Sequence, residues 1–334
     1  MSVPMLPAAG EKPPPGFLLP PPRPWRRRLL TAARAAALLL LAAGLIVRST
    51  VQDSLPGTGV IYYATPWSVL AIVALLAAKF AQLRSRRLEC RLLFATSLGC
   101  ALAWHSSSWQ IRDPGTAQTE VRVATWNVAH GSLGLRELVE HLATMRPDIA
   151  VLVEADPADE DVRGICKAAF PEHHVSILGA GLVLISRWPA GEAKAYRLGS
   201  PKVDSRLREL DVETPWGPWT IFAVDLGSDP LYFRRPTFEL LAEHLDRRRG
   251  QPMIVAGDFN TPLDSTNFRM LRTRGLRELF LSSGNGYTPT WPVPAPVLSL
   301  DQIWVSETLS PVRCERHWHW RSDHAAVVGV ISPL

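Results

Sequence analysis

The stretch PMIVAGDFNTP, residues 252–262, passes from an apolar strand directly into polar residues. Met253 to Ala256 form the apolar run, and Asp258 and Asn260 then place a carboxylate and a carboxamide two residues apart. Gly, Asp, Asn and Pro are the residues from which turns are made. Polar groups at the carboxyl end of a strand also form active sites, because a rigid scaffold there presents them to a ligand. The eleven residues leave both interpretations open.

The composition divides the chain of 334 residues into two parts. This length favours one large domain with an appendage, or two domains. Apolar residues concentrate before residue 110, and most acidic residues lie after it. The net charge of +5 is carried partly by arginine clusters in the first hundred residues. The basic balance is therefore not interpreted as a footprint of nucleic-acid binding.

The four cysteines are too few for a disulfide framework and lack metal-ligand spacing. Cys90 and Cys100 lie in an apolar stretch, whereas Cys166 and Cys314 lie far apart in the rest of the chain. We therefore expect four buried thiols. A Cys166–Cys314 disulfide stays open as an alternative if that part of the chain faces an oxidising compartment.

Three apolar segments predict a membrane region over residues 29–110 with about three transmembrane helices. The segments 29–47 and 59–78 are each long enough to cross a bilayer core, which takes roughly 20 residues. The segment 92–104 reaches that length only if residues 105–109 are included. Before these segments, residues 1–28 are rich in proline and predict a disordered cytoplasmic tail.

Basic residues flank the apolar segments unevenly, and their distribution predicts the orientation. Five precede the first segment, Arg48 offset by Asp53 follows it, and five lie between the second and the third. The positive-inside rule then puts the amino terminus and the second loop in the cytoplasm, and everything after about residue 110 outside. A cleavable signal peptide is the competing interpretation of the first segment, but the long proline-rich lead and two further apolar segments argue against it. The prediction is a multi-pass plasma-membrane protein with an extracytoplasmic domain.

The domain at 117–334 alternates short apolar runs with amphipathic stretches. This pattern predicts two β-sheets packed together with helices outside. Expected helices are 135–145, 238–247 and 265–279, and expected strands are 121–128, 148–155, 181–189, a hairpin over 205–226, the opening stretch, 300–306, 312–320 and 325–331. The segment HWHWR, 317–321, is expected to belong to a half-buried strand beside the site, with an aromatic patch facing lipid or substrate as the alternative.

Polar residues follow or begin five of these runs, in a fixed order along the chain. Each alone is common in turns or at a solvated strand end. Their shared position at strand ends favours one common site. They are Asn127 in TWNVAHG, Glu154 in VLVEAD, Asp258 and Asn260 in GDFN, Asp301 in LDQI, and Asp323 and His324 in RSDH.

This ordered set resembles the endonuclease/exonuclease/phosphatase superfamily, the DNase I-like metal-dependent phosphoesterases. The resemblance covers roughly residues 119–333, and the weaker features SRWP (186–189) and TPTWP (288–292) fall at the expected places. It implies an α/β fold, a four-layer α/β sandwich, here preceded by an amino-terminal transmembrane helical region. It also implies a phosphoric ester hydrolase that uses Mg²⁺ or Mn²⁺.

The resemblance implies metal-binding roles for three residues. Glu154 is expected to bind the ion, because hard cations take carboxylate oxygens. Asn127 is expected to make a carboxamide contact near the metal or the phosphate, and Asp323 to support the metal site.

It assigns the chemistry of hydrolysis to four others. His324 takes the role of general base or phosphate-polarising group, with Asp301 orienting its ring. Asp258 positions or deprotonates the attacking water, and Asn260 holds a phosphoryl oxygen. Whether Asp258 or His324 is the base stays open.

Two positions depart from the family pattern. Asp225, in AVDLGSD, stands where many members have a histidine; it can supply a metal ligand or an acid but no positive charge. Ala129 stands where nucleases often have a carboxylate, which favours one metal centred on Glu154 and makes DNA-repair nuclease activity less expected. Arg206 can approach an anionic substrate, although an arginine on a strand face is ordinarily just solvated, and His130 is expected to be a surface residue of a loop.

The resulting hypothesis is a membrane-anchored, metal-dependent phosphoesterase that hydrolyses a phosphate ester at the outer face of the membrane. Its tether favours a membrane-associated substrate such as a lipid or another envelope phosphate. An extracytoplasmic nuclease is the alternative enzyme, so nucleic acid is a second, less expected partner. A catalytically impaired sensor that binds a phosphorylated ligand is the alternative from another class.

Overall fold

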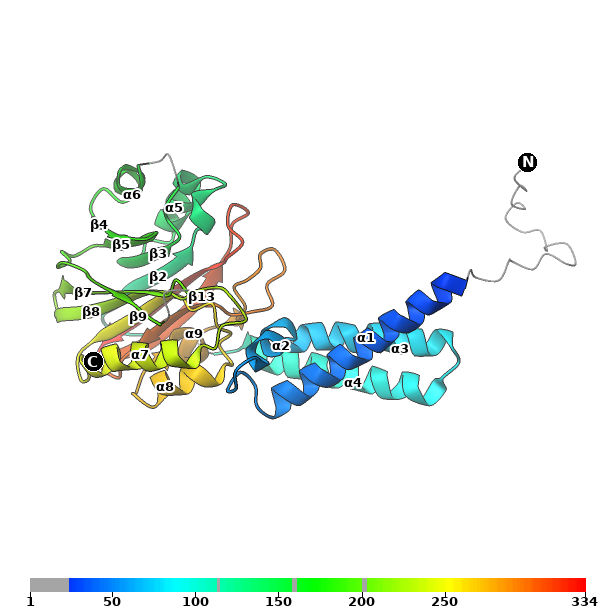
Figure 1. Ribbon diagram of the computed structural model, residues 1–334. Coiled ribbons are helices and arrows are strands. Elements are labelled where there is room, and N and C mark those ends of the chain that lie inside the picture. Colours follow the sequence, from blue (N-terminus) through cyan, green and yellow to red (C-terminus); the bar gives the residue numbers. More distant parts are fainter. Residues whose placement is uncertain (1–23, 113–114, 158–160, 200–202) are drawn as a thin grey trace, which may run out of the picture.

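The computed structural model describes residues 24–112, 115–157, 161–199 and 203–334. Most of the expected amino-terminal tail, residues 1–23, lies outside the described residues. Figure 1 shows two parts, a long helical unit and a rounded part built from two sheets and short helices. The boundary between them falls close to residue 110, as the composition predicts.

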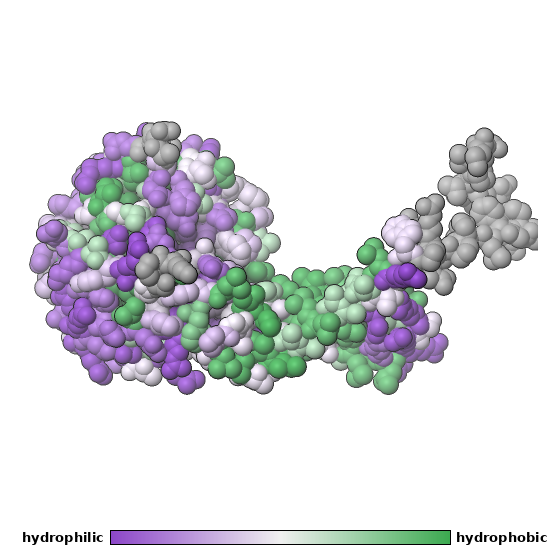
Figure 2. Space-filling model, viewed as in Figure 1, coloured by the Kyte–Doolittle hydropathy of each residue, from purple (hydrophilic) through white to green (hydrophobic). Residues whose placement is uncertain are grey.

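The helical unit contains four helices, of which three run along its length (Figure 1). Alanines of the third helix form most of its buried side, where α1 and α4 pack against it. The outer surface of the helical unit is largely apolar (Figure 2), with exposed side chains such as Leu76 and Leu98. The helices are α1 (Pro24–Ser49), α2 (Thr58–Ala64), α3 (Trp67–Leu83) and α4 (Arg87–Ser108).

Among the described residues, one helical segment, Arg28–Ser49 within α1, is long and apolar enough by itself to cross a membrane. The second expected segment, 59–78, is not one continuous helix: α2 and α3 meet at an angle of 74° and meet the same criterion only together. The break lies at Thr65 and Pro66, because proline lacks an N–H and disfavours helical geometry in the residue before it. The helix α4, which contains the third expected segment, does not meet the criterion, so three spans are not established.

The remaining chain forms two six-stranded sheets packed face to face (Figure 1). Buried aliphatic side chains of both sheets form the central core, and a further core joins each sheet to the helices on its outer face. The expected four-layer α/β sandwich is confirmed. In spatial order, one sheet contains β10 (Arg277–Glu278), β12 (Asp301–Val305), β9 (Met253–Asp258), β8 (Gly217–Asp225), β7 (Arg206–Thr214) and β6 (Lys194–Arg197); the other contains β13 (Leu309–His317), β14 (Ala326–Pro333), β2 (Val121–Asn127), β3 (Ile149–Val153), β5 (Leu182–Ser186) and β4 (His174–Gly179).

Short helices cover the outer faces of the sandwich. The amphipathic helices α5 (Leu135–Thr144) and α6 (Val162–Ala169) pack on the sheet that contains β2, and α7 (Arg235–Asp246) packs on the sheet that contains β9. The helix expected over 265–279 is shorter than predicted, because the chain turns at Gly275 with a φ of +80° that favours glycine. The remaining pieces are η1 (Ala129–Gly131), η2 (Thr266–Phe268), α8 (Arg269–Arg272), α9 (Leu279–Ser283) and a two-stranded sheet of β1 (Trp109–Gln110) and β11 (Gly286–Tyr287).

Two further expectations can be compared with the structure. The strand β13 ends at His317, and the side chains of Trp318 and Trp320 are 51% and 69% exposed. The half-buried strand expected for HWHWR is therefore wrong for these two tryptophans. The four cysteines are free, as expected, although Cys90 is only partly buried.

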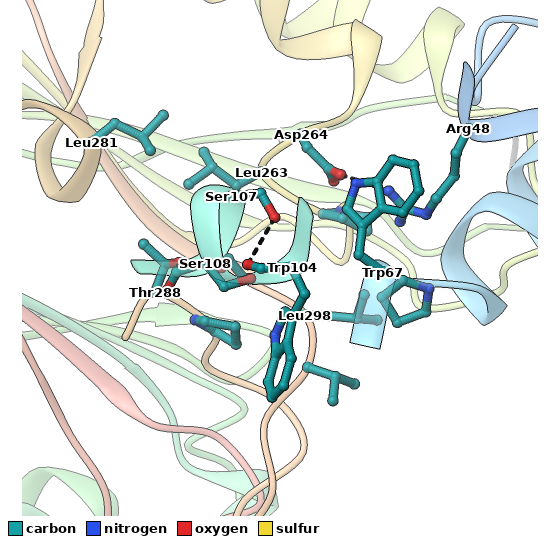
Figure 3. Close-up of a pocket in the computed structure, with 15 residues that line it drawn as sticks. Arg48, Trp67, Trp104, Ser107, Ser108, Leu263, Asp264, Leu281, Thr288 and Leu298 are labelled. Atoms are coloured by element: carbon teal, nitrogen blue, oxygen red, sulfur yellow. Dashed lines mark hydrogen bonds and ion pairs between the residues drawn. The ribbon is translucent and has the colours of Figure 1, made fainter. Parts of the chain in front are cut away.

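The loop after α1 fastens the helical unit to the sandwich. Asp53 is buried and accepts hydrogen bonds from the Thr266 N–H at 3.0 Å and from Asn267 Nδ2 at 3.0 Å. Arg48 is buried and donates to Asp264 Oδ2 at 2.9 Å; Figure 3 shows this pair beside Trp67. Arg48 and Asp53 were expected only as charges that flank the apolar segments, whereas in the structure they join two parts of the chain about two hundred residues apart.

Candidate active site

The polar strand ends meet at one edge of the sandwich because the strand register brings them there. Asp258 ends β9 and lies in register with Asp225 of the parallel strand β8 and with Asp301 of the antiparallel strand β12. Gly257 allows this approach: its φ is +146°, and a Cβ there would lie 1.9 Å from the Val224 carbonyl oxygen. Three carboxylates therefore stand side by side on neighbouring strands.

Hydrogen bonds hold the Asp258 carboxylate in one orientation. Its Oδ2 accepts from Asn127 Nδ2 at 3.0 Å and from Asn260 Nδ2 at 3.2 Å, and its Oδ1 accepts from the Asn260 N–H at 2.7 Å. The Asn127 Oδ1 accepts in turn from the Ala129 N–H at 2.9 Å. The segment GDFN is therefore both a local turn and part of a longer-range site, since Asn127 comes from another sheet.

His324 lies between two of the carboxylates. Its Nδ1 is 2.8 Å from Asp301 Oδ2, and its Nε2 is 4.0 Å from Asp258 Oδ2. The main chain on either side is fixed, because the His324 N–H donates to Ser322 Oγ and the His324 carbonyl accepts from Trp126 Nε1. Asp301 thus orients one nitrogen of the ring and leaves the other facing Asp258.

Burial and the close charges shift the acid–base behaviour of this group. Burial opposes the charged form of the His324 ring, but the charges of Asp301, Asp258 and Asp323 outweigh it and raise the pKa to about 10. Burial, with the charge of Asp301 adding to it, raises the pKa of Asp258 above its ordinary value, while His324 and the two asparagine hydrogen bonds oppose the rise. Burial, with the charge of Asp258 adding to it, raises the pKa of Asp225 to about 8, and Arg206 opposes the rise.

Glu154 contacts a histidine from another part of the chain. It follows β3 with a φ of +54°, an uncommon conformation for a residue with a side chain. The Glu154 Oε2 is 3.3 Å from His130 Nε2, and the His130 Nδ1 is 2.8 Å from Asp156 Oδ1. His130 is exposed, as expected, but it lies in the short helix η1 rather than in a loop, and its contact with Glu154 was missed. The position of His130 three residues after Asn127 was the available signal.

The other expected site residues lie nearby. Asp323 Oδ2 accepts from Trp291 Nε1 at 3.0 Å. Arg206 Nη1 donates to Asp225 Oδ2 at 3.2 Å and to the Ala180 carbonyl oxygen at 2.8 Å. Asp225 carries no positive charge, but the guanidinium of Arg206 lies beside it. This guanidinium is already paired with the carboxylates of Asp204 and Asp225.

A cavity of about 780 Å³ lies beside five of the expected site residues, whereas Asn127, Arg206, Asp225 and Asp301 are not among its lining residues. Its polar wall contains Glu154, Asp258, Asn260, Asp323 and His324. Val60, Tyr63 and Ala64 of α2 also line it. The contribution of α2 to the cavity was not predicted, because these residues lie in the apolar segment 59–78, which was expected to span the membrane.

The residues of the site suit a divalent cation. Asp258, Asp301 and His324 each offer a ligand atom, and these atoms lie within 4.8 Å of one another. The Asp301 Oδ1 is buried and has no hydrogen-bond partner among the described residues. Glu154 and Asp323 add carboxylate oxygens on the same cavity, and such oxygens are the ligands that Mg²⁺ and related hard cations prefer.

Comparison with known proteins agrees with this architecture. The uncharacterized protein YbhP of Escherichia coli K12 is 35% identical over 112 residues, which are 31% of this chain and 43% of YbhP. The alignment thus spans less than half of that relative. An endonuclease/exonuclease/phosphatase from Beutenbergia cavernae has a similar fold, with a TM-score of 0.52 at 20% identity over 65% of this chain and 72% of that one. TDP2 of D. rerio, solved with a single-strand DNA product, gives 0.53 at 16% identity over 64% of this chain and 100% of its own.

The family model extends over the whole site. The model of the Endonuclease/Exonuclease/phosphatase family matches residues 124–324, which is more than half of the 334 residues. The matched range contains the described strand ends from Asn127 to His324. The chain belongs to the endonuclease/exonuclease/phosphatase family.

Proposed function

We propose that this protein is a membrane-anchored, divalent-metal-dependent phosphoesterase that hydrolyses a phosphate ester at the outer face of the membrane. The shape of the candidate active-site cavity carries the proposal. Asp258 and His324 form one wall, and Tyr63 of the helical unit forms part of the other. A substrate in this cavity would touch both parts of the protein, so it would lie at the base of the sandwich, next to the membrane.

We assign residues 1–28 to a cytoplasmic tail, 29–110 to the membrane region and 117–334 to the catalytic domain. The exposed apolar surface of α1, α3 and α4 supports the membrane region (Figure 2). Such a surface is unfavourable in water and favourable in lipid.

The orientation rests on the two ends of the helical unit. The amino end of α1 and the turn between α3 and α4 lie far from the sandwich (Figure 1), and Arg28, Arg84 and Arg86 are exposed there. The loop between α1 and α2 lies at the other end, on the sandwich. The positive-inside rule then favours a cytoplasmic location for the arginine-rich end and an extracytoplasmic location for the catalytic domain.

The proposed reaction is attack of water on the phosphorus atom. Asp258 positions the water and takes its proton, because a carboxylate with a raised pKa is a better base near neutral pH. Asn127 and Asn260 hold Asp258 in place. The Asn260 Nδ2 also donates to the Leu226 carbonyl oxygen at 2.7 Å, and it would exchange this bond for one to a phosphoryl oxygen. His324, oriented by Asp301 and charged below its raised pKa, polarises the phosphoryl group.

The remaining site residues would handle charge around the ester. We place a Mg²⁺ or Mn²⁺ ion on Glu154, with Asp323 and Asn127 in support, rather than on the cluster around His324, because a protonated imidazole cannot be a metal ligand. The ion would neutralise phosphoryl oxygens and assist the leaving group. Arg206, which pairs with Asp225, would contact the anionic substrate next to that residue. His130 would compete with the ion for Glu154 when the ring is protonated, because its Nε2 already faces that carboxylate.

The assay of choice uses the full chain in phospholipid nanodiscs with Mg²⁺ or Mn²⁺. Four substrates separate the candidate reactions: methyl 4-nitrophenyl phosphate, 4-nitrophenyl phosphate, single-stranded DNA and hexadecyl phosphate. We expect turnover of at least one phosphate ester and its loss in Glu154→Ala and His324→Ala. The exposed residues Glu172 and His174 give matched controls, Glu172→Ala and His174→Ala, which keep activity.

Each outcome points to one function. Turnover of DNA alone would replace the proposed function by the extracytoplasmic nuclease. Binding of phosphorylated ligands without turnover of any substrate would favour the impaired sensor. Orientation is measured separately: a carboxyl-terminal reporter that is active only in the cytoplasm should be silent, and an active reporter would overturn the extracytoplasmic location.

A further inference from the structure

A second and larger cavity lies between the helical unit and the sandwich. It is a groove of about 960 Å³, within the range of sites that bind small organic molecules. The helices α3 and α4 supply one wall, including Ile72, Leu75 and Ala101. The segment 293–297, VPAPV, supplies apolar side chains of the other wall. Its charged lining residues among those described are Glu315 and Arg316.

A small cavity of about 110 Å³ has lining residues in common with both the groove and the candidate active-site cavity. It shares Trp104, Pro289 and Val297 with the groove. It shares Pro262 and Leu298 with the active-site cavity. Figure 3 shows the side chains that line this small cavity, among them Trp104 and Leu298. The three cavities therefore adjoin in a row that leads from α3 and α4 to the residues around His324.

The surroundings of the groove match the border of a bilayer. Ile72 and Leu75 are 58% and 49% exposed and continue the apolar outer surface of α3. Trp109 and Trp318, both of which line the groove, are 46% and 51% exposed. Tryptophan is enriched where protein crosses the boundary between hydrocarbon and headgroups. An apolar groove at the boundary between hydrocarbon and headgroups would be filled by hydrocarbon more favourably than by water.

We propose that the groove binds the hydrocarbon chain of the substrate, so that the substrate is an amphiphilic phosphate ester. The chain lies against Ala101 and Leu75, and the phosphate reaches Asp258 and His324 past the small cavity that adjoins both sites. This inference rests on the proposed phosphoesterase function and adds a second binding site to it. A longer chain would bury more apolar surface in the groove, so long-chain substrates would be favoured over short ones with the same reacting phosphate.

The test compares substrates that differ only in chain length, with the full chain in phospholipid nanodiscs. Hexadecyl and methyl 4-nitrophenyl phosphate form one pair, and hexadecyl and butyl phosphate form the other. The variant Ala101→Trp fills the groove, and Ala95→Trp makes the same change at an exposed position of α4 outside it. We expect the ratio of kcat/KM for the long over the short substrate to fall about tenfold or more in Ala101→Trp only. An unchanged ratio in Ala101→Trp would overturn the inference.

A second measurement does not depend on catalysis. Hexadecyl phosphate with a photoreactive diazirine at the end of its chain is cross-linked to the full chain, and the labelled peptides are identified by mass spectrometry. We expect labels in 68–75, 97–104 or 293–297, and their loss in Ala101→Trp but not in Ala95→Trp. Labels confined to other surfaces would contradict the inference. Absence of turnover in the first experiment would refute the phosphoesterase function, and the labelling would then still test the groove.

Discussion

The His324 ring lies 2.8 Å from the Asp301 carboxylate, from Nδ1 to Oδ2. The two residues are 23 positions apart, and Asp301 begins the strand that pairs with β9. The contact orients the ring so that Nε2 faces Asp258 at 4.0 Å. One strand pairing therefore sets the geometry of the residues that we propose to act on water and on the phosphoryl group.

Replacing Asp301 by asparagine should impair the reaction and change the charge of His324. Asp301→Asn keeps the shape but removes the negative charge that raises the His324 pKa. We expect kcat/KM to fall by about 10²- to 10⁴-fold, the range for loss of an acid–base or polarising group. NMR titration of His324 should show a lower pKa in the metal-free variant. The exposed residue Asp246 gives the control, Asp246→Asn, which should keep activity. Wild-type activity in Asp301→Asn would refute the role of this pair.

The stability of the metal-free protein should fall as the pH rises from about 5 to 9. Asp225 has a folded pKa raised to about 8, so its contribution is present at low pH and is lost as the pH rises through that value. His324, with a pKa raised to about 10, contributes fully below about pH 6.5 and loses its contribution above it. The two effects have the same sign. Thermal unfolding in EDTA at several pH values measures the slope.

The variant Asp225→Asn isolates one part of that slope. Asparagine has a similar shape and does not ionise, so the variant should lose less stability between pH 5 and 8 than the parent. A slope equal to that of the parent would mean that Asp225 is already ionised at low pH in the folded protein. Asp229→Asn, at an exposed loop position, provides the control.

Removing the Asp53 carboxylate should loosen the helical unit from the sandwich. Asp53 is buried and accepts hydrogen bonds from residues 265–267. Asp53→Ala leaves those donors unpaired and should lower the free energy of unfolding by about 2–4 kcal/mol. Limited proteolysis should then cut between α1 and α2 sooner, and activity should fall because α2 lines the cavity.

The matched control is Asp246→Ala. Asp246 is partly exposed and pairs with Arg274 on the surface, and such a pair contributes at most about 1 kcal/mol. Equal stability and equal proteolysis of both variants would show that the Asp53 contacts do not hold the two parts together.

The sequence predicted the sandwich well because its signals are local. Apolar runs identified most of the strands, and the fold and the family are confirmed. The meeting of the strand ends around Asp258 was also foreseeable, since polar residues that follow neighbouring strands share one edge. The roles of these residues, in contrast, are proposals from chemistry and geometry.

The junction between the two parts could not be predicted from local patterns. Arg48 and Asp53 looked like ordinary loop charges because their partners lie more than two hundred residues away. The helix α2 was hidden inside an apolar segment of spanning length, and Pro66 was its one local signal. The wall that α2 gives to the cavity follows from contacts that only the folded chain reveals.

The central claim is metal-dependent hydrolysis of a phosphate ester at this site, and a metal titration tests it most directly. The full chain in nanodiscs is stripped with EDTA and assayed on the four substrates while Mg²⁺ or Mn²⁺ is added back. We predict no turnover without metal, recovery on addition, and a requirement for about 10- to 100-fold more metal, or no recovery, in Glu154→Gln. Turnover that persists in EDTA, or none on any substrate with either metal, would contradict the proposed function.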